Sequence, residues 1–260
     1  MSPLPVPNHV EVRGIGLHSG RPVSVTIHPA PAGAGIVFVH KGERIPATIG
    51  NLKETERGTT LGGVAVVEHF LAAAYGIGVY GLEVEVDGDE LPALDGSALP
   101  WVEAIEKVVS GKQKAVSWTL KSPIKIAKGD ASLEALPYDG FKVHFVVKFA
   151  GIGEQKFSFD AENQDFRKEV SPARTFGYLE EYESLKARGL ALGASLDNAL
   201  VLNQSGYVNQ PRFPDEVVRH KILDLIGDLA LLGKPLKAEI NAVRSGHKLN
   251  SELARRIIKQ

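Results

Sequence analysis

The stretch VVRHKILDLIGDL, from Val217 to Leu229, is mostly apolar but carries His220, Asp224 and Asp228 at spacings of four. In an α-helix, residues four apart lie on one face, so these polar side chains would form a single stripe. The opposite surface, which would face the core, consists of Ile222, Leu225, Ile226, Leu229 and Leu232. Buried polar groups need partners, because an unpaired buried charge is costly or shifts its protonation state. The stretch therefore predicts a buried helix whose polar stripe has a specific role.

A metal site is one such role. His220 and Asp224 can chelate a cation from one side of the helix. A shorter helix signal, VVEHFLAAAYGIG at residues 66–78, adds Glu68 and His69. His69, His220 and Asp224 would make a site with three ligands and an open fourth position, which is typical of catalytic rather than structural zinc. Glu68, next to a ligand, is placed to take a proton from metal-bound water.

The alternative for these residues is an ordinary polar pair, the commoner reason for a His four residues from an Asp. A third histidine, His247, follows glycine in SGHKLN, and we expect it in a loop, where a catalytic side chain is easily presented. The joint occurrence of these elements favours the metal site over the polar pair.

The chain also reads as two similar halves. In each half, alternating apolar and polar residues predict a hairpin-like pair of strands, followed by a helix, a strand, a glycine loop and a final helix. The first half has these elements at residues 21–40, 66–78, 81–86, 95–100 and 101–109. The second half has them at residues 129–149, 217–233, 236–243, 245–250 and 251–259. Short patterns can match by chance, but this ordered recurrence favours internal duplication.

The predicted fold class is therefore α+β, with two similar two-layer α/β-sandwich domains. A pseudo-twofold axis between them could bring His69 and His220 to one interface. The polar stretch SGKQKAVS at residues 110–117 marks the junction. We expect a first domain over residues 1–112 and a second over residues 113–260, the latter with an insert at about 180–204.

Composition limits the function classes. The chain has 260 residues, 43% of them hydrophobic, a formal net charge of −1 and no cysteine. Disulfides, thiolate nucleophiles and Cys-based zinc sites are excluded, and no global basic field favours nucleic acid. No apolar run is long enough to span a bilayer, and the first residues, MSPLPVPNHVEVRG, lack a signal-peptide pattern. We expect a cytoplasmic monomer without stable membrane insertion.

Seven motifs together carry a family resemblance. They are GIGLHSG (14–20), VEH (67–69), PALDGSALP (92–100), ARTFGY (173–178), RGLALGASLDNALV (188–201), VRHKILDLIGDL (218–229) and SGHKLN (245–250). As an ordered set covering nearly the whole chain, they closely resemble the UDP-3-O-acyl-N-acetylglucosamine deacetylases, the zinc amidases of lipid A synthesis.

The resemblance implies that helices of two α+β domains face each other across the active site. At matched positions, His69, His220 and Asp224 would hold zinc. Glu68 would be the general base that takes the proton of the attacking water, and His247 the general acid that donates to the leaving nitrogen.

Further roles follow from the same resemblance. Asp228 would orient His247 and stabilise its charge, Thr175 would help bind the oxyanion, and Lys221 would contact the substrate near the metal. Glu181 and Arg244 match positions of nucleotide-side contacts.

The segment GLALGASLDNALVL, from Gly189 to Leu202, resembles an insert that forms a hydrophobic passage for a fatty acyl chain. The candidate lining residues are Leu17, Phe176, Gly193, Ala194 and Leu196. Without the resemblance, an ordinary helix–turn–strand packed on the sheet would be the preferred interpretation. The chain departs from the family at Val66, where Thr is usual, and at Pro211 and Pro214, so acyl length and the shape of the substrate entrance are open.

The predicted function is zinc-dependent hydrolysis of the N-acetyl group of an acylated UDP-N-acetylglucosamine, which releases acetate. The alternatives are deacetylation of a non-acylated nucleotide sugar and a non-catalytic protein that binds a metal or a nucleotide sugar. Glu68 and His247 argue against the latter, because a binding protein needs neither base nor acid. Two histidines and one aspartate suit Zn²⁺ and also Fe²⁺.

Overall fold

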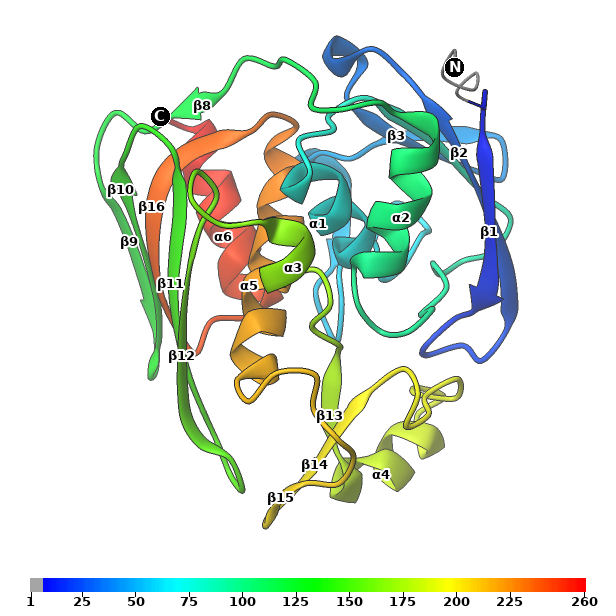
Figure 1. Ribbon diagram of the computed structural model, residues 1–260, viewed down its shortest axis with the longest axis vertical. Coiled ribbons are helices and arrows are strands. Elements are labelled where there is room, and N and C mark those ends of the chain that lie inside the picture. The colour runs from blue at the N-terminus through cyan, green and yellow to red at the C-terminus, as the bar shows by residue number, and fades with distance from the viewer. Residues whose placement is uncertain (1–6) are drawn as a thin grey trace, which may run out of the picture.

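Two mixed β-sheets flank a central layer of helices in the computed structural model, which describes residues 7–260 (Figure 1). The first six residues of the predicted first domain lie outside the described residues. The central helices are α1 (Glu68–Gly76), α2 (Leu99–Val108), α5 (Glu216–Leu229) and α6 (His247–Ile258). This mixed architecture confirms the predicted α+β class.

The first sheet contains, side by side, β1 (Val10–Ile15), β2 (Pro22–Pro29), β7 (Leu82–Val86), β3 (Ile36–His40) and β4 (Glu43–Pro46). Only the β7–β3 pair is parallel, and the other neighbours are antiparallel. Alternation along β2 buries Val23, Val25 and Ile27 against the helices.

The second sheet repeats this order. It contains, side by side, β9 (Ile124–Lys128), β10 (Ala131–Pro137), β16 (Leu236–Val243), β11 (Phe141–Phe149) and β12 (Gly153–Asp160). Among these five strands, again only β16 and β11 run parallel. A short strand, β8 (Trp118–Thr119), pairs in parallel with the first residues of β16. The equal strand order supports the inferred duplication, which stays a prediction together with its boundary at residue 112.

The predicted hairpin-like pairs are wrong in one respect. β2 and β3 are not hydrogen-bonded neighbours, because β7 lies between them, and β16 separates β10 from β11 in the same way. Period-two alternation fixes which side chains face the core but not which strand is the neighbour. In each half, a strand that comes later in the sequence takes the central position.

The helices follow their sequence signals closely. α5 continues as a short 3-10 helix, Ala230–Leu232, and ends at Gly233, whose φ of 70° is left-handed. The prediction at SGHKLN is wrong in detail, because α6 begins at His247 and not at Ser251. Gly246 is extended and Leu249 and Asn250 are buried, so the segment packs as the first turn of the helix.

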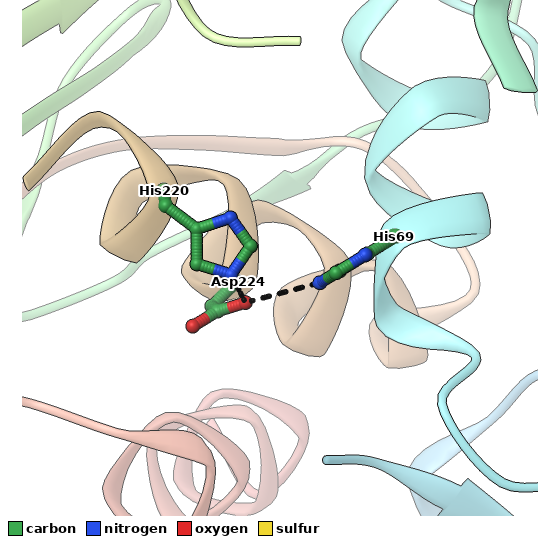
Figure 2. Close-up of side chains that lie close together, drawn as sticks. All are labelled: His69, His220 and Asp224. Carbon is green, nitrogen blue, oxygen red and sulfur yellow. Dashed lines mark ion pairs between the residues drawn. The ribbon is translucent and has the colours of Figure 1, made fainter. Parts of the chain in front are cut away.

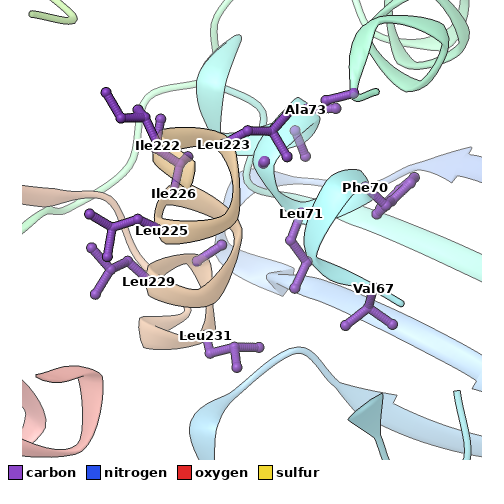
Figure 3. Close-up of a cluster of buried hydrophobic side chains, with 14 of the residues drawn as sticks. Val67, Phe70, Leu71, Ala73, Ile222, Leu223, Leu225, Ile226, Leu229 and Leu231 are labelled. Atoms are coloured by element: carbon purple, nitrogen blue, oxygen red, sulfur yellow. The ribbon is translucent and has the colours of Figure 1, made fainter. Parts of the chain in front are cut away.

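α1 and α5 cross closely at the centre of the molecule (Figure 3). Leu71 and Ala73 of α1 and Leu223 of α5 are fully buried among the apolar side chains drawn there. Gly227 permits the approach, since a Cβ at this position would lie 2.1 Å from the Glu68 carbonyl oxygen. The crossing therefore depends on a missing side chain, and it places the first turn of α1 beside the polar stripe of α5.

The region of the predicted insert forms a separate layer at the lower end of the molecule (Figure 1). It comprises β13 (Phe176–Tyr178), a 3-10 helix (Leu179–Glu181), α4 (Tyr182–Ala187), β14 (Leu200–Asn203) and β15 (Gly206–Tyr207). β13, β14 and β15 make their own small sheet and join neither large one.

The other short elements are 3-10 turns at Ala32–Ala34 and Ile49–Asn51, β5 (Leu52–Glu54), β6 (Thr60–Leu61) and α3 (Phe166–Glu169). Among residues 7–260, no helix combines the length and the apolar character needed to cross a bilayer.

Candidate active site

The predicted ligands meet between α1 and α5 (Figure 2). His69 Nε2 lies 3.8 Å from Asp224 Oδ1, and His220 Nε2 lies 3.2 Å from the same oxygen. The two imidazole rings are nearly perpendicular, with centroids 4.9 Å apart. One ligand atom from each of the three residues lies within 4.8 Å of the others. All three are buried, so the cluster faces inward.

The two carboxylate oxygens of Asp224 have different surroundings. Oδ2 accepts a hydrogen bond from Lys221 Nζ at 2.6 Å. Oδ1 is buried and accepts no hydrogen bond from any described residue. His220 Nδ1 lies 3.1 Å from the Ala173 carbonyl oxygen and donates to it, which leaves Nε2 with its lone pair toward the cluster. A divalent cation fits this set of two nitrogens and one oxygen.

The protonation states agree with a ligand role. Burial, reinforced by the neighbouring His220, lowers the pKa of His69 to about 3, so its imidazole is neutral. Burial alone would raise the pKa of Asp224, but His220, Lys221 and His247 outweigh it and hold the pKa well below its usual range. Metal ligands must be deprotonated, and these two are.

Glu68 opens α1 and is only 3% exposed. Its Oε2 accepts a hydrogen bond from the Thr59 backbone N–H at 2.8 Å. Burial raises the pKa of Glu68 to about 7, and the nearby carboxylates of Asp224 and Asp228 act in the same direction. A carboxylate with a pKa near neutrality is well suited to act as a general base.

His247 and Asp228 form a second pair across the α5–α6 contact. His247 Nδ1 lies 2.9 Å from Asp228 Oδ2. Burial lowers the pKa of His247, but the carboxylates of Asp228 and Asp224 outweigh it and raise the pKa to about 9. The imidazole is therefore protonated near neutral pH, as a general acid must be.

Two residues around Asp228 were missed in the sequence. Thr59 Oγ1 donates to Asp228 Oδ1 at 2.5 Å, and Asn250 Nδ2 donates to Asp228 Oδ2 at 2.8 Å. Asn250 lies in the SGHKLN motif, three residues after His247. Residues three apart lie on one face of a helix, so this spacing could have indicated that Asn250 is near His247. Thr59 gave no signal, because it lies in a loop 169 residues from Asp228 in the sequence.

A cavity of about 530 Å³ opens onto these groups. Its lining includes Glu68, His69, His220, Lys221, Asp224 and His247. It also includes the predicted substrate-side residues Leu17, Thr175, Phe176, Ala194 and Leu196. The lining is predominantly apolar on the side of the insert.

Three predicted substrate residues do not line this cavity. Gly193 lies behind it, where its N–H donates to Leu17 O and a Cβ would lie 2.2 Å from Gly16 O. Glu181 pairs at 2.9 Å with Arg57, which does line the cavity. Arg244 pairs with Asp130. Whether these three reach a bound nucleotide stays a prediction.

A family model described as LpxC: UDP-3-O-acyl N-acetylglycosamine deacetylase matches residues 5–259. The chain belongs to this family. The resemblance read from the ordered motifs is thereby confirmed.

Individual relatives also match this chain over nearly its whole length. The UDP-3-O-acyl-N-acetylglucosamine deacetylase of Anaeromyxobacter dehalogenans (strain 2CP-C) is 43% identical over 97% of this chain and 86% of the relative. The protein of the same description from Myxococcus xanthus (strain DK1622) is 42% identical over 95% of this chain and 83% of the relative. That from Coxiella burnetii (strain CbuK_Q154) is 41% identical over 96% and 88%. Nearly the whole chain is thus similar to proteins described as deacetylases.

Proposed function

We propose that this chain hydrolyses the N-acetyl group of UDP-3-O-acyl-N-acetylglucosamine, in lipid A biosynthesis, and releases acetate. One observation carries the proposal: Asp224 Oδ1 is buried, accepts no hydrogen bond from residues 7–260, and faces two imidazole nitrogens beside a cavity. Such an arrangement is costly unless a cation completes it.

The metal would be held by His69, His220 and Asp224. We favour Zn²⁺, and the same ligands suit Fe²⁺. When bound, the metal supplies Lewis-acid polarisation of the acetamide carbonyl and lowers the pKa of water to about 7.

The other residues supply proton transfer. Glu68 takes a proton from the attacking water, whose oxygen adds to the acetamide carbon. Thr175 and protonated His247 stabilise the resulting negative charge on the carbonyl oxygen. His247 then donates its proton to the nitrogen as the carbon–nitrogen bond breaks, giving the amine and acetate. Asp228 keeps His247 oriented and charged, as its 2.9 Å contact allows.

The apolar part of the cavity would take the acyl chain. Leu17, Phe176, Ala194 and Leu196 contribute to its wall. Each buried methylene contributes about 0.8 kcal/mol, so a chain of several methylenes gives a large preference for the acylated sugar. This separates the proposal from the alternative, a deacetylase of a non-acylated nucleotide sugar.

Acetate release from the acylated sugar and from UDP-N-acetylglucosamine, each with and without a chelator, tests the proposal. We expect turnover that the chelator abolishes and that is far faster on the acylated sugar. Equal rates on the two sugars would favour the alternative. Ala194→Gln should reduce kcat/KM only for the acylated sugar. Val116→Gln, at a side chain that is 77% exposed and outside the cavity, is the control.

The cytoplasmic location and the monomeric state belong to the same proposal. The oligomeric state is checked by light scattering of the purified protein.

A further inference from the structure

The polar stripe of α5 extends one turn further than the sequence interpretation placed it. Glu216 lies four residues before His220, at the first position of the helix, and its side chain is fully buried. A carboxylate at a helix N-terminus is ordinarily explained by the helix dipole alone. A fully buried one needs direct partners.

Both oxygens of Glu216 have them. Oε1 accepts hydrogen bonds from the backbone N–H and from Nε of Arg174, both at 2.9 Å. Oε2 accepts from Arg174 Nη2 at 3.2 Å and from the backbone N–H of Arg212 at 2.5 Å. Arg174 is itself only 6% exposed and donates once more, to the Gln210 carbonyl oxygen. The pair is thus buried and satisfied.

Arg174 lies between two groups of the proposed active site. On one side, the Ala173 carbonyl accepts the Nδ1 hydrogen of His220, one turn along α5 from Glu216. On the other side, Thr175 lines the cavity. Glu216 and His220 therefore hold Arg174 and Ala173 against a single face of α5, and Thr175 is the next residue in the chain.

The segment is also tied to the first half of the chain. The Thr175 N–H donates to the Gly96 carbonyl oxygen at 2.7 Å. Arg212 Nη1 donates to Asp95 Oδ2 at 2.8 Å, beside its backbone contact with Glu216. The PALDGSALP motif, to which the proposed mechanism gives no role, thereby connects to Glu216 and to Thr175.

We propose that the buried Arg174–Glu216 ion pair is a positioning device. It fixes the segment 173–175 against α5, and thereby fixes Thr175 and the imidazole of His220 relative to each other. Neither Arg174 nor Glu216 is among the residues that line the cavity. The proposal rests on the proposed function for its catalytic readout, and it has a separate readout in metal binding. A bidentate guanidinium–carboxylate pair suits the task, because it fixes orientation as well as distance.

The test compares Glu216→Gln with the unchanged chain in two backgrounds, with Thr175 intact and with Thr175→Val. In the intact background we expect kcat to fall by about 10–100-fold, the usual effect of losing a residue that orients a ligand. In the Thr175→Val background the further fall should be much smaller, because the ion pair then has less to position. A role in folding alone would give equal factors within about twofold, as independent sites do. Equal factors would overturn the link to Thr175.

The second readout uses Co²⁺ as the probe, through its visible absorption and its affinity. We expect Glu216→Gln to alter the spectrum and to weaken Co²⁺ binding about tenfold, since His220 loses its fixed orientation. An unchanged spectrum and affinity would overturn the link to His220. This readout does not depend on the substrate. If the unchanged chain fails to deacetylate the acylated sugar, the proposed function fails while the positioning of His220 is still decided.

Two further variants keep the test decisive. Glu169→Gln removes an ion pair with Arg219 of the same helix, at 2.8 Å, which does not involve residues 173–175. It should leave kcat and the Co²⁺ spectrum unchanged. If Glu216→Gln does not fold, Arg212→Gln breaks the contacts of the Arg212 guanidinium with Asp95 and with the Pro172 carbonyl oxygen, and it keeps the backbone contact with Glu216. It should show the same dependence on Thr175 with a smaller amplitude, and equal effects in both backgrounds would again overturn the proposal.

Discussion

α1 and α5 occupy corresponding places in the two halves, and each presents a histidine to the same cluster. In both, two valines and one further residue precede the histidine. That further residue is Glu68 in α1 and Arg219 in α5. Glu68 lines the cavity, whereas Arg219 is turned away from it. Its guanidinium lies 3.7 Å from the centre of the Phe157 ring.

The difference continues along the two helices. Four residues after the histidine, α1 has Ala73 and α5 has Asp224. Ala73 is fully buried in the apolar contact, and Asp224 faces the cluster. The two helices therefore carry unequal chemistry: in the proposed mechanism the first half supplies one ligand and the base, and the second half supplies two ligands and the acid.

The largest effect is expected for metal affinity, at the histidine that both helices carry. His69→Ala and His220→Ala should each lower metal affinity by about 10³-fold or more, because even residues that only orient ligands contribute about 10–100-fold. Elemental analysis after dialysis measures the loss. His40→Ala is the control, since His40 is a buried histidine that pairs with Asp89 outside the cluster. Full metal retention in either ligand variant would refute the assignment.

The next effect concerns the position where the helices differ. Glu68→Gln should keep its metal and lose about 10²–10⁴-fold in kcat, the usual contribution of a general base. The matched change in α5, Arg219→Gln, should lower only the stability, because Arg219 packs on aromatic rings and pairs with Asp215 and Glu169. Steady-state kinetics beside denaturant unfolding separates the two. Similar kcat losses in both variants would contradict the comparison.

Asp228 should give a smaller effect with a distinct signature. Burial lowers the pKa of His247, but the carboxylates of Asp228 and Asp224 together raise it to about 9, so the proposed acid stays protonated over a wider pH range. Asp228→Asn removes the charge but keeps the shape. The basic limb of the pH–kcat/KM profile should move down by about 1–3 units, the range for an opposite charge at this distance. An unshifted limb would remove Asp228 from the mechanism.

The smallest effect is expected where α1 and α5 cross, and it concerns stability. Gly227→Ala places a Cβ against the Glu68 carbonyl oxygen and should cost about 1–3 kcal/mol of unfolding free energy, as overpacking does. Gly33→Ala is the control, because a Cβ at Gly33 would have no heavy atom of residues 7–260 within 4 Å apart from its own residue and its chain neighbours. Equal stability of the two variants in urea would mean that α1 and α5 can move apart without a cost in unfolding free energy.

The sequence predicts the helices better than the sheets. α5 carries its own boundaries, with acidic residues at its start and Gly233 at its end, so its prediction needed nothing from elsewhere in the chain. The pairing of β2 with β7 depends on residues far along the chain, which alternation does not encode. The contacts of Thr59 and the Arg174–Glu216 pair could not be predicted for the same reason. The partners are distant in sequence, and these residue types are common at positions without such a role.

In both sheets the central strand is the last of its half to be synthesised. β10 pairs with β9 and β11 with β12 locally, but β16 must insert between these two hairpins. Pairing over such long separations forms slowly, and open strand edges are prone to aggregate. We therefore expect the second half to remain two unjoined hairpins on the ribosome until residue 243 has emerged. His247 follows directly, so the acid of the site arrives with the strand that closes the sheet.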